Sequence, residues 1–291
     1  MNLPKVSIIF PNYNGGKEPL DCIKSIKNLN YPKEKIAIIT IDNGSTDGSS
    51  LKIQKKFPEV ILIKNKKNLG FAKAINQGIK LAKGQYIFIT NDDIVFEKNS
   101  LKNLINYSQK LHDLAVLGGK IYLKSNPQKL ASCGYHMNPW TGNVGSYQEP
   151  NIIKEPEWIP GCAMLVPRKI LAKVGLLDDN FTYSFDDFDY CLRVKKAGFK
   201  VVYLPQAIFW HGESTTANRN RKLKHYGWYQ SKLRFAIKNL SFSNIISILF
   251  CQILTLPYIA VTRKDHRVIP FAKALLWNLQ NLRKTLKYRK R

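Results

Sequence analysis

The sequence predicts an α/β protein in which a mostly parallel central sheet is flanked by helices and is followed by a basic helical extension. Over the first 120 residues, short apolar runs typical of buried strands alternate with segments of helical periodicity, which indicates a largely parallel sheet. Polar turns rich in Gly and Asn follow three of the first four apolar runs. Beyond about residue 216 the composition changes, because basic residues there greatly outnumber acidic ones.

The first part of the chain contains four predicted strands and three predicted helices. The strands cover residues 6–10, 36–41, 60–64 and 85–90, and the helices cover 19–29, 50–56 and 72–82. Polar segments begin at Pro11, Asp42 and Asn91, directly after the first, second and fourth strands. The carboxyl ends of parallel strands lie at one edge of a sheet, which is where open α/β sheets bind ligands. We therefore expect the functional site at this edge.

The middle of the chain is less regular. Residues 121–160 are rich in Gly, Pro, Asn and Trp, and we expect irregular strands and loops that line a pocket. A buried strand is predicted over 158–166, followed by short strands over 199–204 and 208–211.

The positive charge is concentrated at the C-terminal end. The whole chain of 291 residues has a formal net charge of +26 and is 44% hydrophobic, so it can form a substantial core. Residues 1–216 hold 29 Lys and Arg against 19 Asp and Glu, a net charge of +10. Residues 217–291 hold 17 against Asp265 alone, a net charge of +16. Such an excess predicts an anionic partner, either a membrane surface or a nucleic acid.

An apolar segment lies within this basic extension. Residues 245–261 are mostly apolar but include Gln252 and Pro257, and their length is at the lower limit for crossing a bilayer. Three arrangements are open: attachment to the membrane surface, a buried pair of helices, or a true span. Surface attachment is favoured, because basic residues flank both ends: Lys232, Arg234 and Lys238 before, and Arg263, Lys264 and Arg267 after.

The cysteines and the N-terminus indicate the compartment. The five cysteines are odd in number, widely scattered and without a C-x-x-C pair, which argues against a disulfide framework and a zinc site. Met1 to Lys5 lead directly into the first strand without the pattern of a signal peptide. We expect a cytoplasmic protein at the inner face of the cell membrane.

Two acidic clusters are the strongest signal of function. Asn91-Asp92-Asp93 directly follows the fourth predicted strand, and Asp186-Asp187-Phe188-Asp189 begins a predicted helix. Five carboxylates in two short runs suggest a cation site and a proton acceptor. Helix caps and solvated loop charges are the alternative, because Asp is favoured at both.

Several motifs follow one another along the chain: Val6 to Asn14, Ile41 to Ser49, Asn68 to Ala72 with Asn76 to Gly78, Asn91 to Asp93, Gly161 to Leu165, Phe185 to Arg193, and His211 with Ser214. In this order they resemble family 2 glycosyltransferases with the Rossmann-like GT-A fold, especially the rhamnosyltransferase-like branch. The resemblance covers about residues 4–216, so we expect a GT-A domain over 1–216 and the extension over 217–291.

The resemblance implies a site for a nucleoside-diphosphate sugar and a divalent cation. Asp93 and His211 are the implied ligands of Mg²⁺ or Mn²⁺, which would neutralise the charge of the leaving diphosphate. Asn91, which replaces the first acid of the family's D-x-D motif, is expected near the ribose. The remaining residues expected to bind substrate are Pro11, Asn12, Tyr13, Asn14, Asp42, Asn43, Asn68, Gly70, Asp92 and Asp186. For Asp42 a helix cap, and for Gly70 a simple turn, remain alternatives.

The second acidic cluster is implied to hold the catalytic base. By the resemblance, Asp187 would take the proton from the acceptor hydroxyl while the oxygen attacks the anomeric carbon opposite the diphosphate, which inverts the configuration. Asp189 is open to a structural role, capping the helix and pairing with Arg193.

Three classes of function compete on this reading. The leading one is an inverting transferase that moves a sugar, rhamnose by the closest motif resemblance, to a lipid-linked or polysaccharide acceptor in cell-envelope glycan synthesis. A catalytically silent GT-A-like scaffold is the alternative. A nucleic-acid binder is disfavoured, because no nucleic-acid-binding motif occurs and long aliphatic stretches interrupt the basic tail.

Overall fold

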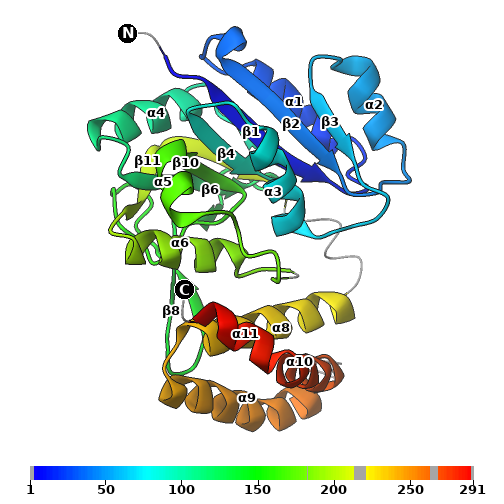
Figure 1. Cartoon of the computed structure of the whole chain (residues 1–291), viewed down its shortest axis with the longest axis vertical. Helices are drawn as coiled ribbons and strands as arrows, with labels where there is room; N and C mark the ends of the chain where they lie inside the picture. Colours follow the sequence, from blue (N-terminus) through cyan, green and yellow to red (C-terminus); the bar gives the residue numbers. More distant parts are fainter. Residues whose placement is uncertain (1–2, 182, 213–220, 263–267, 290–291) are drawn as a thin grey trace.

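The computed structural model describes residues 3–181, 183–212, 221–262 and 268–289 (Figure 1). Within these residues the central sheet has nine strands, in the order β3-β2-β1-β4-β10-β6-β11-β5 with β7 added beside β6. Their bounds are β1 Val6–Asn12, β2 Ile36–Asp42, β3 Ile61–Lys64, β4 Tyr86–Thr90, β5 Ile94–Phe96, β6 Ala115–Leu123, β7 Leu130–Ser132, β10 Ala163–Pro167 and β11 Lys200–His211. A separate hairpin pairs β8 Tyr135–Met137 with β9 Val144–Ser146.

The predicted mostly parallel sheet is confirmed. Strand β1 pairs in parallel with both β2 and β4, and β2 pairs in parallel with β3. Strands β6 and β11 form a fourth parallel pair. Strand β10 joins the two parts by running antiparallel to β4 and β6, and β5 is antiparallel to β11.

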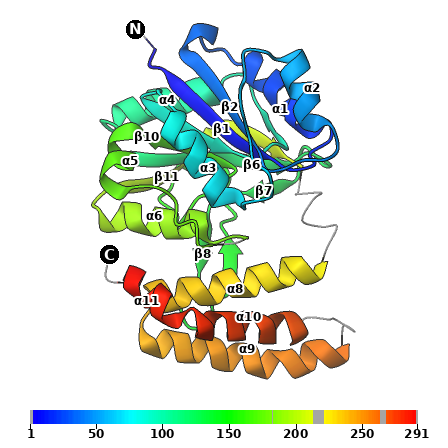
Figure 2. The ribbon, with the colours of Figure 1, turned by 45° about the vertical axis from the view of Figure 1, so that its right-hand side comes forward.

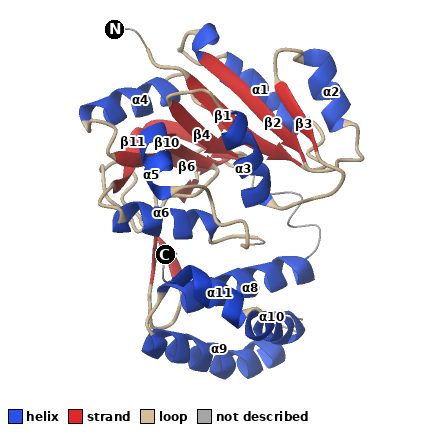
Figure 3. Ribbon diagram, viewed as in Figure 1, coloured by secondary structure: helices blue, strands red, loops and turns tan. Residues whose placement is uncertain are grey.

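Helices cover both faces of the sheet (Figures 1 and 3). Along β1, Ile8 and Phe10 pack into one core cluster and Ile9 into the other, as expected for alternating side chains. The first cluster includes residues of α1 Glu18–Lys27, α2 Ser49–Lys56 and α4 Ser100–Lys110. The second includes residues of α3 Phe71–Leu81, α5 Arg168–Val174 and α6 Asp186–Lys196.

The middle of the chain differs from the sequence prediction. The two strands predicted over 199–204 and 208–211 form one strand, β11, whose register shifts between Leu204 and Ile208. The predictions did not include β5, α4 or most of β6. Strand β6 contains Gly118 and Gly119, which lower strand propensity. A Cβ at Gly119 would lie 2.3 Å from the carbonyl oxygen of Ala207, so the close approach of β11 requires glycine there.

The C-terminal extension is helical, as predicted, and α8 Arg221–Asn239 lies nearest the sheet (Figure 2). Helices α10 Val268–Gln280 and α11 Leu282–Arg289 pack on α8, and α9 Phe242–Thr262 runs beside them. No helix among the described residues combines the length and the apolar character that a membrane crossing needs. The boundary at residue 216 stays a prediction, because residues 213–220 lie outside the described residues.

One part of the membrane-surface prediction is corrected. Lys232, Arg234 and Lys238 were expected to face lipid, but all three are buried. Arg234 and Lys238 form ion pairs with Asp178, in the segment before α6. Asp178 is 56 positions before Arg234 and 60 before Lys238 and lies outside their helix. The charge pattern of the helix alone therefore gave the wrong prediction. Arg263, Lys264 and Arg267 lie outside the described residues.

Candidate active site

The ends of β1 and β2 form the first part of the site. Asn12 and Asp42 are register partners at the last position of their strands, and both are buried. The Asn12 amide donates to the Asp42 carboxylate at 3.4 Å and to the Ser49 hydroxyl at 2.9 Å. Asp42 also accepts a hydrogen bond from the backbone N–H of Ser45 at 3.2 Å. Asp42 is therefore fixed at the strand edge rather than acting as the N-cap of α2, which is Gly48.

The turn after β1 is held against the turn after β2. Asn14 adopts a left-handed backbone with φ of 53°, its N–H donates to Ser45, and its side-chain oxygen accepts from the N–H of Thr46. Pro11 lies within β1, whereas Tyr13 is exposed and its ring is available to a ligand. Gly15 is required, because a Cβ there would lie 2.5 Å from a carboxylate oxygen of Asp92.

Asn43, Asn68 and Gly70 form a connected loop structure beside this edge. The Asn43 amide donates to the Gly70 carbonyl at 3.3 Å, and the Asn68 side chain accepts from the Gly70 N–H at 2.8 Å. Gly70 has φ of 85° and caps the start of α3, so the turn alternative for this glycine accounts for its conformation.

The pairing of β5 with β11 brings Asp93 and His211 together, although 118 positions separate them in the sequence. His211 is the register partner of Ile94, the residue after Asp93. The His211 Nε2 atom lies 3.2 Å from Asp93 Oδ1 and 3.2 Å from the Asn91 amide nitrogen. Three of the predicted residues therefore meet at one point of the sheet edge.

The donor set at this point fits a hard divalent cation. Neighbouring ligands of an octahedral ion at about 2.1 Å lie about 3 Å apart, close to the separation of Asp93 Oδ1 and His211 Nε2. Among the described residues no group of three or more His, Cys, Asp or Glu has the geometry of a metal site. Two protein ligands leave positions for phosphate oxygens and water, which is how Mg²⁺ is commonly held in proteins. Burial and then the charge of Asp93 raise the pKa of Asp92 to about 8.

The two acids at the start of α6 differ in environment. Asp187 is partly exposed, and its carboxylate accepts hydrogen bonds from the backbone N–H of Gly161 at 3.0 Å and of Phe188 at 2.8 Å. Asp186 is buried, and one of its oxygens has no hydrogen-bond partner. Burial raises the pKa of both groups, and the charge of Asp187 raises that of Asp186 further. Asp187 is thus the acid that a substrate hydroxyl can reach.

The Gly161–Cys162 segment links the two acidic clusters, because the Gly161 N–H donates to Asp187 at 3.0 Å. Burial, and then the charges of Asp93 and Asp187, raise the pKa of the Cys162 thiol. The Cys162 carbonyl accepts a hydrogen bond from the Thr90 hydroxyl at 2.7 Å, which ties it to the end of β4. The two acidic clusters of the sequence therefore belong to one site.

Asp189 has the structural role that the sequence left open. It is fully buried and pairs with Arg193 at 2.9 Å, while Lys238 of α8 approaches its other oxygen at 2.8 Å. Trp158 is a core residue, stacked on Phe188 with ring centroids 4.0 Å apart.

An ion pair between Lys124 and Glu18, which the sequence did not predict, is also present. The Lys124 N–H donates to the His211 carbonyl at 2.8 Å, so this pair lies beside the site without any local motif to mark it.

Comparisons with known proteins identify the family. The family model described as glycosyl transferase family 2 matches residues 7–171, which is more than half of the chain. The chain belongs to glycosyl transferase family 2. It is 24% identical over 250 residues to the N-acetylglucosaminyl-diphospho-decaprenol L-rhamnosyltransferase of Mycobacterium tuberculosis, covering 70% of this chain and 80% of that protein.

Two further likenesses are informative. The poly(ribitol-phosphate) beta-N-acetylglucosaminyltransferase TarP of Staphylococcus aureus is 31% identical over 119 residues, which cover 40% of this chain and 36% of TarP. The mannosyltransferase PcManGT from Pyrobaculum calidifontis, solved with GDP-Man and Mn²⁺, has a TM-score of 0.61 at 15% identity, covering 100% of this chain and 85% of that one. At such identity the likeness shows the fold, and the predicted GT-A fold of this glycosyltransferase is confirmed.

Proposed function

We propose that this glycosyltransferase carries out a metal-dependent, inverting transfer from a nucleoside-diphosphate sugar to an acceptor hydroxyl. Two contacts carry the proposal: His211 lies 3.2 Å from Asp93, and the Gly161–Cys162 segment bonds both Asp187 of α6 and Thr90 at the end of β4. A divalent cation bound by Asp93 and His211 would neutralise the charge that develops on the leaving diphosphate. Asn12, Asp42 and Asn43 border the same edge and would contact the nucleoside.

The geometry at α6 supports a single displacement. Asp187 accepts two backbone hydrogen bonds, which favour its charged form and orient its carboxylate. A carboxylate held in this way can accept the proton of an acceptor hydroxyl as its oxygen attacks the anomeric carbon. One attack from the side opposite the diphosphate inverts the anomeric configuration. Asp186, which is buried, would position the acceptor side of the site.

The donor sugar and the acceptor are inferred from relatives. The similar protein of Mycobacterium tuberculosis is named as a rhamnosyltransferase that acts on N-acetylglucosaminyl-diphospho-decaprenol, and TarP is named for poly(ribitol-phosphate). We therefore propose rhamnose as the sugar, and a lipid-linked or polysaccharide acceptor in cell-envelope glycan synthesis.

The outer helices support a position at the inner membrane surface. On α9, Phe242, Ile246, Phe250 and Ile253 are exposed at helical spacing, so they form one apolar face. Helix α10 exposes Ile269, Leu276 and Leu279, and the adjoining basic residues Lys273, Arg283, Lys284 and Lys287 are also exposed. Apolar faces beside positive charge are typical of helices that lie on anionic lipid.

Calorimetric titration of the full chain with UDP, GDP and dTDP, with and without Mn²⁺ or Mg²⁺, tests the donor site. We expect one nucleotide to bind in a metal-dependent manner, and its sugar conjugate to turn over with a product of inverted configuration by NMR. Nucleotide binding without any turnover would favour the silent scaffold. Absence of nucleotide binding by well-folded protein would overturn the proposal.

A further inference from the structure

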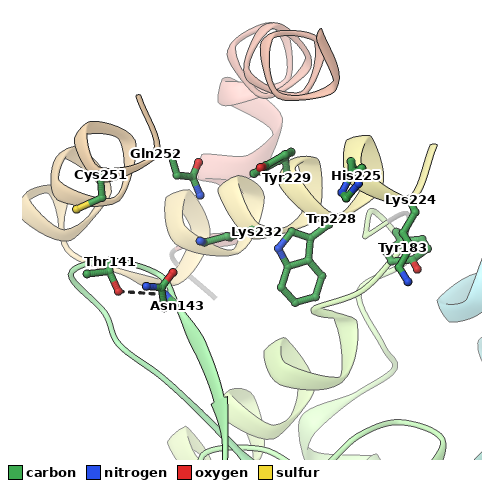
Figure 4. A pocket seen from close by; sticks show the side chains of 10 residues that line it. All are labelled: Thr141, Asn143, Tyr183, Lys224, His225, Trp228, Tyr229, Lys232, Cys251 and Gln252. Carbon is green, nitrogen blue, oxygen red and sulfur yellow. Dashed lines mark hydrogen bonds between the residues drawn. The ribbon is translucent and has the colours of Figure 1, made fainter. Parts of the chain in front are cut away.

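A cavity of about 620 Å³ lies between α8, α9, the turn of the β8–β9 hairpin and the segment before α6 (Figure 4). None of the residues proposed above to bind the donor or the metal lines it. Its volume is typical of a small-molecule site.

Lys232 is the main polar feature of the cavity. The side chain extends from α8 toward the hairpin turn that carries Thr141 and Asn143 (Figure 4). Only 7% of Lys232 is exposed, and it forms no ion pair or hydrogen bond within the part of the chain that the structure describes. Burial lowers the pKa of Lys232 to about 8. A buried ammonium without a counter-charge is unfavourable, so an anion in the cavity would stabilise it.

The surroundings of Lys232 are shaped for its ammonium group and carry further positive charge. Gly142 has φ of 65°, a conformation that favours glycine, and a Cβ there would lie 2.5 Å from Lys232 Cε and would have to displace the end of the lysine. Lys224 and His225 line the same cavity, and none of the ten described lining residues is Asp or Glu. Among the described lining residues, the buried Lys232 with no acid beside it favours an anionic ligand.

The cavity lies beside the segment that leads into α6, the helix that carries the proposed base. Tyr183 lines the cavity and packs against Gly227 of α8, while Asp187 follows four residues later, at most about 14 Å away along the chain. Trp228, another lining residue, contacts Phe185 with ring centroids 5.1 Å apart. A ligand in the cavity therefore lies on the α6 side of the site, where the acceptor must approach Asp187.

We propose that this cavity binds the phosphate or diphosphate group of the acceptor, with the Lys232 ammonium as its principal ligand. The inference rests on the proposed function, because it assumes that a hydroxyl of the same molecule reaches Asp187. A lipid diphosphate and a phosphate-linked polyol chain present the same anionic group. The aromatic walls formed by Trp228 and Tyr183 can pack against the sugar or polyol next to the phosphate.

The test is calorimetric titration of the full chain, in EDTA, with farnesyl diphosphate, inorganic diphosphate and glycerol 3-phosphate. We expect Lys232→Met to weaken binding of the phosphate probes by on the order of 10- to 100-fold, the usual effect of losing a hydrogen bond to a charged group. Lys120→Met is the matched control, because Lys120 is also 7% exposed but bonds Asn151 outside the cavity. Tighter binding of farnesyl diphosphate than of the other probes would identify a lipid source, and preference for glycerol 3-phosphate a polyol source.

Parallel titrations separate this inference from the proposed function. Lys232→Met should leave metal-dependent nucleoside diphosphate binding within about twofold of wild type, and its thermal unfolding midpoint reports whether it is folded. Gly142→Ala, which displaces the Lys232 ammonium but keeps its charge, should also weaken binding of the phosphate probes. Unchanged phosphate binding in Lys232→Met, or equal loss of nucleotide and phosphate binding, would overturn the cavity assignment. If the protein binds no nucleotide but binds phosphate in a Lys232-dependent manner, the assignment of the cavity holds and the assignment of the donor site is wrong.

Discussion

Substituting Asp178 by Asn should sharply destabilise the contact between the sheet region and α8. Asp178 accepts from Lys238 at 2.8 Å and lies 3.4 Å from Arg234, and the side chains of all three are at most 6% exposed. Arg234 also donates to the Thr285 hydroxyl at 2.8 Å, so the same cation holds α11. Removing the Asp178 charge leaves the buried Arg234 guanidinium without its carboxylate, whereas Lys238 keeps its contact with Asp189.

The expected cost follows from burial rather than from the number of ion pairs. Loss of one partner from a buried pair costs about 3–5 kcal/mol, and Asn keeps one hydrogen bond to Lys238, so we expect about 3 kcal/mol. Glu59→Gln is the control, because its pair with Lys27 is about half exposed and should contribute at most about 1 kcal/mol.

The effect of Asp178 should also depend on pH. Burial opposes ionisation, but the hydrogen bond and charge of Lys238 outweigh it and hold the pKa of Asp178 well below its usual 3.8. A depressed carboxyl pKa gives stability that is fully present above the unfolded pKa and is lost as pH falls toward the folded pKa. The difference in free energy of unfolding between wild type and Asp178→Asn should therefore be constant from pH 5 to 7 and become smaller below about pH 4.

Urea unfolding followed by tryptophan fluorescence measures both effects on the full chain. The reasoning is refuted if Asp178→Asn loses no more free energy of unfolding than Glu59→Gln does. A pH-independent difference down to pH 3 would show that the carboxylate charge is not what stabilises the contact.

Three further predictions concern the proposed activity. Asp93→Asn should abolish metal-dependent nucleotide binding with an unchanged unfolding midpoint, and normal binding by calorimetry would contradict its assignment. Asp187→Asn should keep donor affinity but lower turnover by about 10²-fold or more, whereas Asp186→Asn should cost less; the reverse order would reassign the base. Replacing Phe250 and Ile253 together by Ser should reduce cosedimentation with anionic liposomes, and wild-type protein that never sediments would refute membrane attachment.

The sheet edge was predictable from the sequence because its signals are local. Each buried strand is followed by a polar turn, so the position of its carboxyl end can be predicted. Asn12 and Asp42 are the last residues of β1 and β2, and Asn91 directly follows β4. The meeting of Asp93 with His211 was implied only by family resemblance. In the structure it depends on the antiparallel pairing of β5 with β11, a long-range contact that neither strand specifies alone.

The extension shows why charge patterns mislead. Lys232, Arg234 and Lys238 lie within seven consecutive residues of α8 and, taken alone, indicate an exposed basic face. The carboxylates that pair with Arg234 and Lys238 lie elsewhere in the chain. Asp178 is in the segment before α6, and Asp189 is on α6 itself. Only the tertiary structure brings these charges together, so sequence reasoning assigned them to lipid.

The extension also contributes to the site that it packs against. Phe188, in the first turn of α6, is stacked between Trp158 at 4.0 Å and Phe235 of α8 at 4.2 Å. Asp189, one residue later, is bonded by Lys238 of the same helix. These contacts fix the helix turn on which Asp187 stands, so its side chain stays partly exposed while its neighbours are buried. Helix α8 therefore positions the proposed base, and a chain ended at residue 216 would uncover Phe188 and Asp189 rather than only release a membrane anchor.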